Sequence, residues 1–266
     1  MRLTAPRFPI LMYHGLVADE ADVRGVPAGE LRYTLSVETF ARHVNAFAAQ
    51  GYRPVPLTAL LPDGPPITVP RPIVLTFDDG RVSDVHLARP ILDRLGWRSE
   101  HFITVGWVGM PGFMDWTQIR ALAASGHGVY SHTMTHTPLD CLSKAELFSE
   151  IALSKERLEA GLNRPVEFLA LPGGHGISRA LERLARATGY RGICTSTVGL
   201  NVRGDYLLRR IRITDRATAG DVMQWISGSG LGRVRLRHVT FSTARRILGA
   251  HRYDILREAL LHARRL

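Results

Sequence analysis

The chain has 266 residues, 45% of them hydrophobic and 22% charged, which is ordinary for a globular protein and enough for one large core. The N-terminus lacks the apolar segment of a signal peptide, and no apolar run approaches the ~20 residues that span a bilayer. These features exclude a membrane-spanning protein and lead us to expect a cytoplasmic one. The two cysteines, Cys141 and Cys194, are too few for a disulfide framework or a cysteine-rich metal cluster.

The formal net charge is +10, and because Lys144 and Lys155 are the only lysines, 32 of the 34 basic residues are arginines. Such a balance can indicate nucleic acid, anionic lipid or an acidic polymer as a partner. Most of these arginines are scattered, which fits codon bias better than a binding surface. The last 36 residues are the exception, with nine arginines. We expect no nucleic-acid partner, because no nucleic-acid-binding motif accompanies the charge.

Segments with the pattern of strands alternate with segments with the pattern of helices. The first strand is followed by a long loop without periodicity at 17–32. Strands are expected at 10–13, 52–55, 72–77, 101–105, 129–131, 166–171, 192–195 and 207–213, and helices at 36–50, 84–95, 115–125, 143–162 and 178–188. Capping boxes are expected where Gln118 follows Asp115 and where Glu146 follows Ser143. The alternation predicts parallel βαβ units in a distorted (β/α) barrel of about seven strands.

A glycine-rich run at 227–232 divides the chain into a barrel domain at 1–226 and a basic helical extension at 227–266. We prefer an extension that packs on or beside the barrel. The alternative is an interfacial helix that brings residues 231–266 into peripheral contact with anionic lipid.

Polar residues follow several of the apolar strands directly. His14 follows the first, Asp78 and Asp79 follow the third, and His132 follows a later one. Chemistry in (β/α) barrels lies at the carboxyl ends of the strands. We therefore expect these side chains to meet at one end of the barrel.

His132 and His136 are four residues apart, and Asp79 can complete a set of two imidazoles and one carboxylate. Such a set leaves open positions on a divalent metal, as in catalytic sites. A metal here would polarise a carbonyl and activate a bound water, with Asp78 as the general base and His14 as the general acid. The sequence therefore predicts a metal-dependent hydrolase of an amide or ester, but these parts do not specify a sugar.

Two segments resemble the motifs of the polysaccharide deacetylase family, the carbohydrate esterases with a NodB-homology domain. The run 76–80, Thr-Phe-Asp-Asp-Gly, is similar to the first motif, and 132–136, His-Thr-Met-Thr-His, to the second. The likeness covers roughly residues 9–213. It implies a distorted (β/α) barrel and metal-dependent removal of N-acetyl groups from N-acetylglucosamine-type sugars. It also implies that Asp78 is the base and that Asp79, His132 and His136 bind the metal, usually Zn²⁺, with Co²⁺ or another divalent ion as alternatives.

The chain departs from the family at the third motif, where an arginine normally braces the base. The run 169–174, Leu-Ala-Leu-Pro-Gly-Gly, keeps the turn but lacks the arginine. Arg210 is a candidate replacement, and Arg209 is the other choice. The backbone N–H of Gly174, or of Gly173, is expected to serve the oxyanion.

The usual downstream Leu-x-Leu-x-His motif, the source of the general acid, is also missing. The run 12–15, Met-Tyr-His-Gly, resembles the N-terminal Tyr-His segment of poly-N-acetylglucosamine deacetylases, which assigns the acid to His14. We expect Tyr13, Trp107, Pro172 and Gly173 to contact the substrate.

The expected substrate is an N-acetylated polysaccharide, an oligosaccharide or a lipid-linked precursor. Two other hypotheses stay open. One is a catalytically impaired member that binds glycan in the same groove, and the other is a membrane-surface module.

Overall fold

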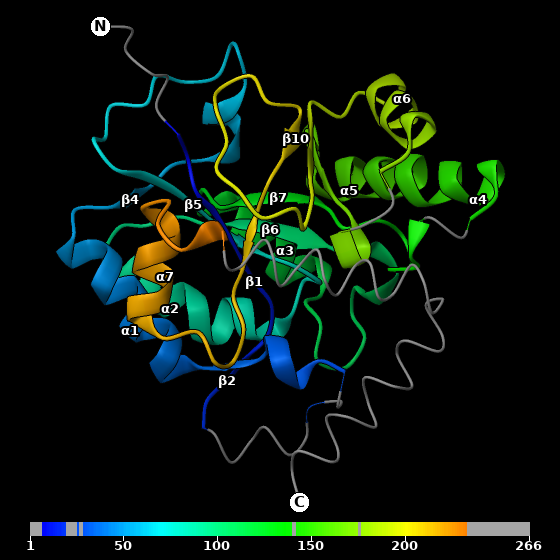
Figure 1. The fold of residues 1–266 in the computed structure, drawn as a ribbon. Helices are drawn as coiled ribbons and strands as arrows, with labels where there is room; N and C mark the ends of the chain where they lie inside the picture. The colour runs from blue at the N-terminus through cyan, green and yellow to red at the C-terminus, as the bar shows by residue number, and fades with distance from the viewer. Residues whose placement is uncertain (1–6, 20–25, 27–28, 140–141, 175–176, 233–266) are drawn as a thin grey trace, which may run out of the picture.

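The computed structural model describes residues 7–19, 26, 29–139, 142–174 and 177–232 (Figure 1). The predicted extension lies outside these residues from 233 onward, so the domain boundary and the membrane contact of 231–266 stay predictions. Among the described helices, none is long and apolar enough to cross a membrane.

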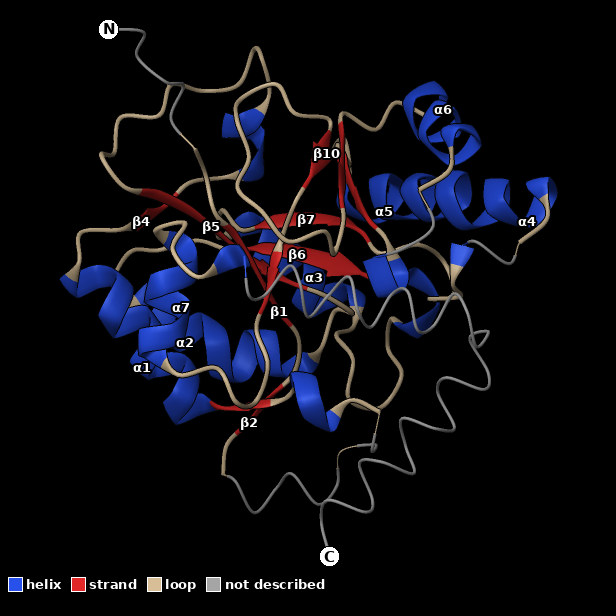
Figure 2. Cartoon of the chain, in the orientation of Figure 1, coloured by secondary structure: helices blue, strands red, loops and turns tan. Residues whose placement is uncertain are grey.

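Parallel strands form a curled sheet at the centre of the molecule (Figure 2). The hydrogen-bonded order is β10-β9-β8-β7-β6-β5-β1-β11, and β4 pairs with β5 on the side. The strands are β1 (Ile10–Tyr13), β4 (Arg53–Pro54), β5 (Pro72–Phe77), β6 (Glu100–Ile103), β7 (Gly128–Ser131), β8 (Phe168–Ala170), β9 (Gly192–Cys194), β10 (Leu207–Leu208) and β11 (Ile211–Arg212).

The two ends of this order are joined by a short run of chain. β10 pairs with β9 and β11 pairs with β1, and only Arg209 and Arg210 separate β10 from β11. Arg209 and Arg210 therefore connect β10 and β11, which lie at opposite ends of the sheet order, and this connection requires the sheet to curl into a barrel. This confirms the predicted (β/α) barrel, but the strand expected at 207–213 is divided because its halves pair with different neighbours.

Helices pack around the sheet in two groups, with α1, α2 and α7 at the left of Figure 1 and α4, α5 and α6 at the right. The helices are α1 (Val37–Ala49), α2 (Arg89–Asp93), α3 (Trp116–Ala124), α4 (Lys144–Phe148), α5 (Ser154–Leu162), α6 (Arg179–Ala187) and α7 (Ala219–Ile226). π-helical turns precede α2 and α5, at η4 (Asp84–Ala88) and η7 (Ser149–Leu153). Short 3₁₀ turns are η2 (Leu31–Tyr33), η3 (Leu57–Leu60), η5 (Val105–Trp107) and η8 (Pro172–Gly174).

Both predicted capping boxes are confirmed, at the starts of α3 and α4. A third, in which Thr218 and Asp221 open α7, was not predicted. The loop expected at 17–32 is shorter than predicted. Its start belongs to β2 (Leu16–Val17), which pairs with β3 (Leu35–Ser36), and its end belongs to η2.

Successive residues of β1 and β5 alternate between two apolar clusters, because side chains of a strand point to opposite faces in turn. Ile10 and Val74 belong to one cluster, whereas Leu75 and Phe77 belong to the other, with side chains of α1, α2 and α7. Thr76 shares the inward parity of Val74. Asp78 follows two residues after Thr76, just beyond the end of β5, and therefore lies on the same face, at the mouth of the barrel.

Candidate active site

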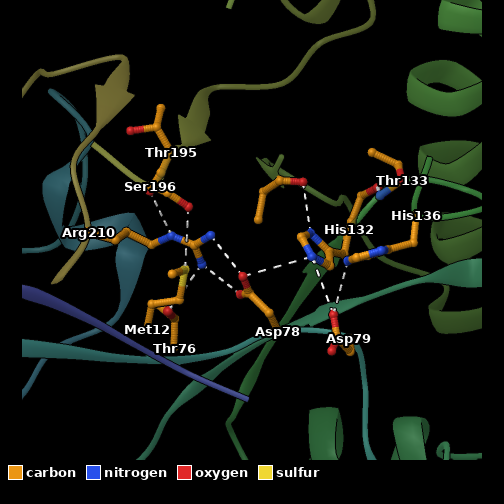
Figure 3. Close-up of polar contacts among 12 residues, drawn as sticks. Met12, Thr76, Asp78, Asp79, His132, Thr133, His136, Thr195, Ser196 and Arg210 are labelled. Atoms are coloured by element: carbon orange, nitrogen blue, oxygen red, sulfur yellow. Dashed lines mark hydrogen bonds and ion pairs between the residues drawn. The ribbon is translucent and has the colours of Figure 1, made fainter. Parts of the chain in front are cut away.

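The two aspartates after β5 point in different directions. Asp78 N donates to Tyr13 O at 3.0 Å, which continues the β1–β5 register and sets His14 opposite Asp78. Asp79 then adopts a left-handed backbone with φ of 78°. Such a conformation is costly for a non-glycine residue and is concentrated at functional sites. The turn separates the carboxylates, so Asp78 faces Arg210 and Asp79 faces the histidines (Figure 3).

A bidentate ion pair holds Asp78. Arg210 Nη1 donates to Oδ1 at 2.6 Å and Nη2 donates to Oδ2 at 2.8 Å, and the arginine side chain is fully buried. Arg210 is itself held by its Nε, which donates to Thr195 O at 3.1 Å. Burial alone would raise the pKa of Asp78, but Arg210, with smaller contributions from His132 and His14, holds it below its usual value. Asp78 is therefore an ionised carboxylate near neutral pH.

Arg209, the other arginine considered for this position, points away from the site. It is exposed, and its Nη1 lies 3.8 Å from Asp205 Oδ2. The residues that split β10 from β11 thus send their side chains to opposite sides, and Arg210 is the one that enters the barrel.

Asp79, His132 and His136 meet on the other side of Asp78. Asp79 Oδ1 lies 3.5 Å from His132 Nε2 and 3.3 Å from His136 Nε2, and the three ligand atoms lie within 4.8 Å of one another. Oδ1 is buried and accepts no hydrogen bond of good geometry. An orphaned carboxylate oxygen between two imidazole nitrogens is what a divalent cation would satisfy, so these residues fit a metal.

The protonation of these groups also suits a metal. His132 Nδ1 donates to Ala170 O at 3.0 Å, which leaves the lone pair of Nε2 facing Asp79. Burial lowers the pKa of His132 to about 4, against the opposing effect of Asp78. Burial would raise the pKa of Asp79, but His136, His14 and His132 together hold it below its usual value. A neutral imidazole and a carboxylate are the forms that bind metals.

His14 lies at the end of β1 on the same rim. Its ring stacks on Tyr33 with centroids 5.0 Å apart, and its Nδ1 is buried without a hydrogen-bond partner. Burial lowers the pKa of His14, whereas the charges of Asp79 and Asp78 raise it in opposition. The charges of both carboxylates thus act on the imidazole of His14, and its Nδ1 makes no hydrogen bond that would compete with a reacting group.

Trp107, Pro172 and Gly173, which were expected to contact the substrate, lie at the rim or beside the metal-binding candidates. Trp107 is half-buried at the rim, with its ring 4.8 Å from that of His136. Pro172 and Gly173 lie in η8, directly after β8, and Gly173 has a φ of 66° that suits glycine; Gly174 ends the same turn. The carbonyl of Ala170 in β8 contacts His132, which places this turn beside the metal residues.

The expectation for Tyr13 is wrong. Its side chain is fully buried on the helix-facing side of β1, where it stacks on Phe77 and its hydroxyl lies 3.3 Å from His43 Nδ1. Burial raises the pKa of its hydroxyl. Because residues alternate along the strand, Tyr13 and His14 face opposite ways, and only His14 reaches the site.

Two residues of the site were missed in the sequence. Arg81 Nε lies 3.8 Å from Asp79 Oδ2, and the same guanidinium pairs with Glu30. The positive charge of Arg81 thus lies beside Oδ2, the oxygen of Asp79 that is farther from the histidines. Glu150 accepts hydrogen bonds from the loop that carries His136. Its position, one residue before the buried Ile151, was the available signal, because a charged residue there interrupts the buried face of a helix.

Known proteins resemble this chain in sequence and in fold. Residues 67–193 match the family model described as polysaccharide deacetylase. The Bacillus subtilis (strain 168) protein YxkH, which carries the name of a polysaccharide deacetylase, is 27% identical over 214 residues, covering 78% of this chain and 72% of that protein.

Solved structures share the barrel at lower identity. The deacetylase PplD of Streptococcus pyogenes matches with a TM-score of 0.74 at 22% identity, covering 84% of this chain and 99% of that one. A de-N-acetylase of Aggregatibacter actinomycetemcomitans matches with a TM-score of 0.73 at 19% identity, covering 83% and 100%. At such identities these structures support the fold alone.

A (β/α) barrel with an Asp-Asp pair and two histidines at the carboxyl ends of its strands defines a class of hydrolases. The family match over residues 67–193, the likeness to YxkH and the two motifs make the chain similar to the polysaccharide deacetylases. These similarities support a hydrolase of carbon–nitrogen bonds other than peptide bonds, and together with the fold they support deacetylation of a glycan.

Proposed function

We propose that this protein is a metal-dependent deacetylase that removes N-acetyl groups from an N-acetylglucosamine-type sugar. The observation that carries the proposal is the Asp78–Arg210 pair beside the convergent Asp79, His132 and His136. An ionised base thus lies next to a set of two imidazoles and one carboxylate, the usual ligands of catalytic zinc. We therefore propose Zn²⁺, with Co²⁺ or another divalent ion as a functional substitute.

The residues of the chain divide the proton transfers between them. A bound metal would supply Lewis acidity to the substrate carbonyl and to the attacking water. Asp78, held by Arg210, accepts the proton of that water. His14 donates a proton to the nitrogen of the departing sugar amine, because it follows β1 opposite Asp78 and its Nδ1 has no hydrogen-bond partner. The N–H of Gly174, in the turn after β8, is the proposed donor to the oxyanion.

The rim fits a sugar. Trp107 presents a partly exposed ring next to His136, and Phe113 packs against it with centroids 4.8 Å apart. A flat aromatic face is a suitable platform for the apolar face of a pyranose. The similar structure from Aggregatibacter is named a de-N-acetylase, which agrees with cleavage of an N-acetyl group. Polymer, oligosaccharide and lipid-linked sugar all remain candidate substrates.

Acetate release tests this function directly. The purified full chain is incubated with N-acetylglucosamine oligomers, a polymer and a lipid-linked N-acetylated sugar, before and after removal of metal with a chelator. We expect release from at least one substrate, its loss on chelation and its recovery when zinc or cobalt is added. Turnover that survives complete chelation would contradict the metal, and tight glycan binding without turnover would favour the impaired, glycan-binding alternative.

His14→Ala separates the acid from the metal site. We expect the variant to bind zinc as the parent does, because His14 is not among the three ligands, and to lose about 10²- to 10⁴-fold in kcat. Zinc affinity and kcat are measured on the same preparation. His86→Ala, which changes an imidazole in η4 outside the site, is the control. Full turnover in His14→Ala would remove the acid role from this residue.

A further inference from the structure

The loop that carries both histidines has a backbone that cannot hold its shape by itself. Thr133 and His136 have φ values of 68° and 65°, in the left-handed region that costs a non-glycine residue free energy. Two such residues within four positions persist only where the surroundings impose them. The contacts of this loop therefore show what imposes its shape.

The buried carboxylate of Glu150 accepts three hydrogen bonds from the middle of the loop. Glu150 Oε2 accepts the backbone N–H groups of Met134 and Thr135, each at 2.9 Å, and Oε1 accepts the hydroxyl of Thr135 at 2.5 Å. Two successive N–H groups that converge on one oxygen form an anion-binding concavity, here filled by the chain's own side chain. The glutamate is 7% exposed, so these bonds are largely shielded from water.

The loop is clamped from the opposite side as well. Gly106 N donates to Met134 O at 2.7 Å, and a Cβ on Gly106 would lie only 2.7 Å from that oxygen. Val105 N donates to Thr133 O at 3.1 Å. Glu150 on one side and the glycine turn on the other therefore fix the backbone directly before His136.

The π-helical turn η7 is what carries Glu150 to the loop. The wider turn lies between α4 and α5 and is a type of distortion found at functional sites. The turn is anchored: Tyr190 Oη donates to Ile151 O at 3.0 Å, and Ser154 Oγ, one residue beyond it, lies 2.8 Å from Ser131 Oγ. Ser131 in turn accepts from Thr133 N at 3.1 Å. Residues of one helical segment thus hold the loop at two points.

His136 depends on this clamp more than His132 does. His132 is oriented by the carbonyl of Ala170 through Nδ1 and is buried. His136 is 32% exposed in its side chain, and its contacts are with Asp79 and the rings of Trp107 and His132. Its place in a metal site is therefore set mainly by the backbone that Glu150 holds.

We propose that Glu150 is a positioning residue that pre-organises the His132–His136 loop for metal binding. The inference rests on the proposed function, because it takes His136 as a ligand. Residues that orient metal ligands typically contribute about 10- to 100-fold to metal affinity. Glu150 acts through hydrogen bonds and does not itself touch the metal.

The test measures the zinc dissociation constant by competition with a chelator, together with urea unfolding of each metal-free protein. We expect Glu150→Ala to weaken zinc binding by about 10- to 100-fold. Glu150→Gln keeps one oxygen for the two N–H groups and should lose much less. Thr135→Val changes an exposed residue, removes one of the three bonds and should give a smaller loss without any loss of folding.

Glu146→Ala is the matched control. Glu146 accepts from Ser143 N at 2.8 Å in the capping box of α4, so its loss lowers the unfolding midpoint but leaves zinc affinity unchanged. A folded Glu150→Ala with the zinc affinity of the parent overturns the proposal. If Glu150→Ala fails to fold, the proposal is overturned instead when Thr135→Val and Glu150→Gln both bind zinc as tightly as the parent does. A parent that binds no zinc contradicts the proposed function first, and the role of Glu150 falls with it.

Discussion

Asp78→Asn is expected to lower acetate release by about 10²- to 10⁴-fold while zinc binding is retained. The amide has the shape of the carboxylate but cannot accept the proton of the attacking water. Its NH₂ group would also face an Arg210 N–H where the parent has an acceptor, so one of the two bonds of 2.6 and 2.8 Å is lost. The substitution leaves Asp79, His132 and His136 in place, and Asp78 Oδ2 lies 3.9 Å from His132 Nε2, farther than Asp79 Oδ1 at 3.5 Å.

Asp84→Asn is the matched control for this variant. Asp84 is another fully buried aspartate, and its Oδ2 lies 3.2 Å from His101 Nδ1. Burial, with the repulsion of Asp79, raises its pKa well above the usual value, whereas the pKa of Asp78 is lowered, and an amide has the shape of either carboxyl group. Acetate release from both variants, at equal zinc content, is the measurement. Parental turnover in Asp78→Asn, or an equal loss in Asp84→Asn, would contradict the assignment of the base.

The sequence predicted the parts of the site that depend on position along one strand. Asp78, Asp79 and His132 follow apolar strands, and parallel strands bring their carboxyl ends to one rim, so their convergence needs no knowledge of long-range contacts. The barrel itself follows from the alternation of strand and helix patterns. The two motifs add specificity, because an Asp-Asp-Gly turn alone has an ordinary structural explanation.

The errors come from features that local pattern does not carry. Tyr13 belongs to a strand in which all residues are apolar, since both faces of a parallel sheet are buried, so no alternation reveals which side chains face inward. Arg209 and Arg210 could not be separated because they lie where β10 ends and β11 begins, and only the pairing of both strands decides which one enters the barrel.

Helix irregularity hid Glu150 in the same way. The segment 143–162 has a continuous helical pattern, in which a glutamate beside the buried Leu147 and Ile151 interrupts the apolar face but does not show what the glutamate contacts. The π-helical turn and the left-handed residues of the loop form together, and neither has a local sequence signature. Function in this protein therefore depends on contacts between segments that each look unremarkable alone.

Arg210→Met is expected to reverse how the contribution of Asp78 to stability depends on pH. In the parent, the folded-state pKa of Asp78 is below its usual value of 3.8, so the pair contributes stability above pH 3.8 that is lost as pH falls through the folded pKa. Without the guanidinium, burial is left as the largest effect and raises the pKa of Asp78 above 3.8. The variant is then penalised for ionising a buried carboxylate, so it loses stability as pH rises. Breaking a buried pair in this way costs about 3–5 kcal/mol once the carboxylate is charged.

Urea unfolding of the metal-free proteins between pH 5 and pH 8 measures this effect. The free-energy difference between Arg210→Met and the parent should be smallest at pH 5 and grow towards pH 8. Asp78→Asn/Arg210→Met removes the charge that causes the penalty, so its difference from the parent should no longer grow with pH. Arg209→Met, which changes the exposed neighbour, should stay within about 0.5 kcal/mol of the parent. An equal loss in Arg210→Met at every pH would mean that the arginine contributes packing rather than charge, and that another group keeps Asp78 ionised.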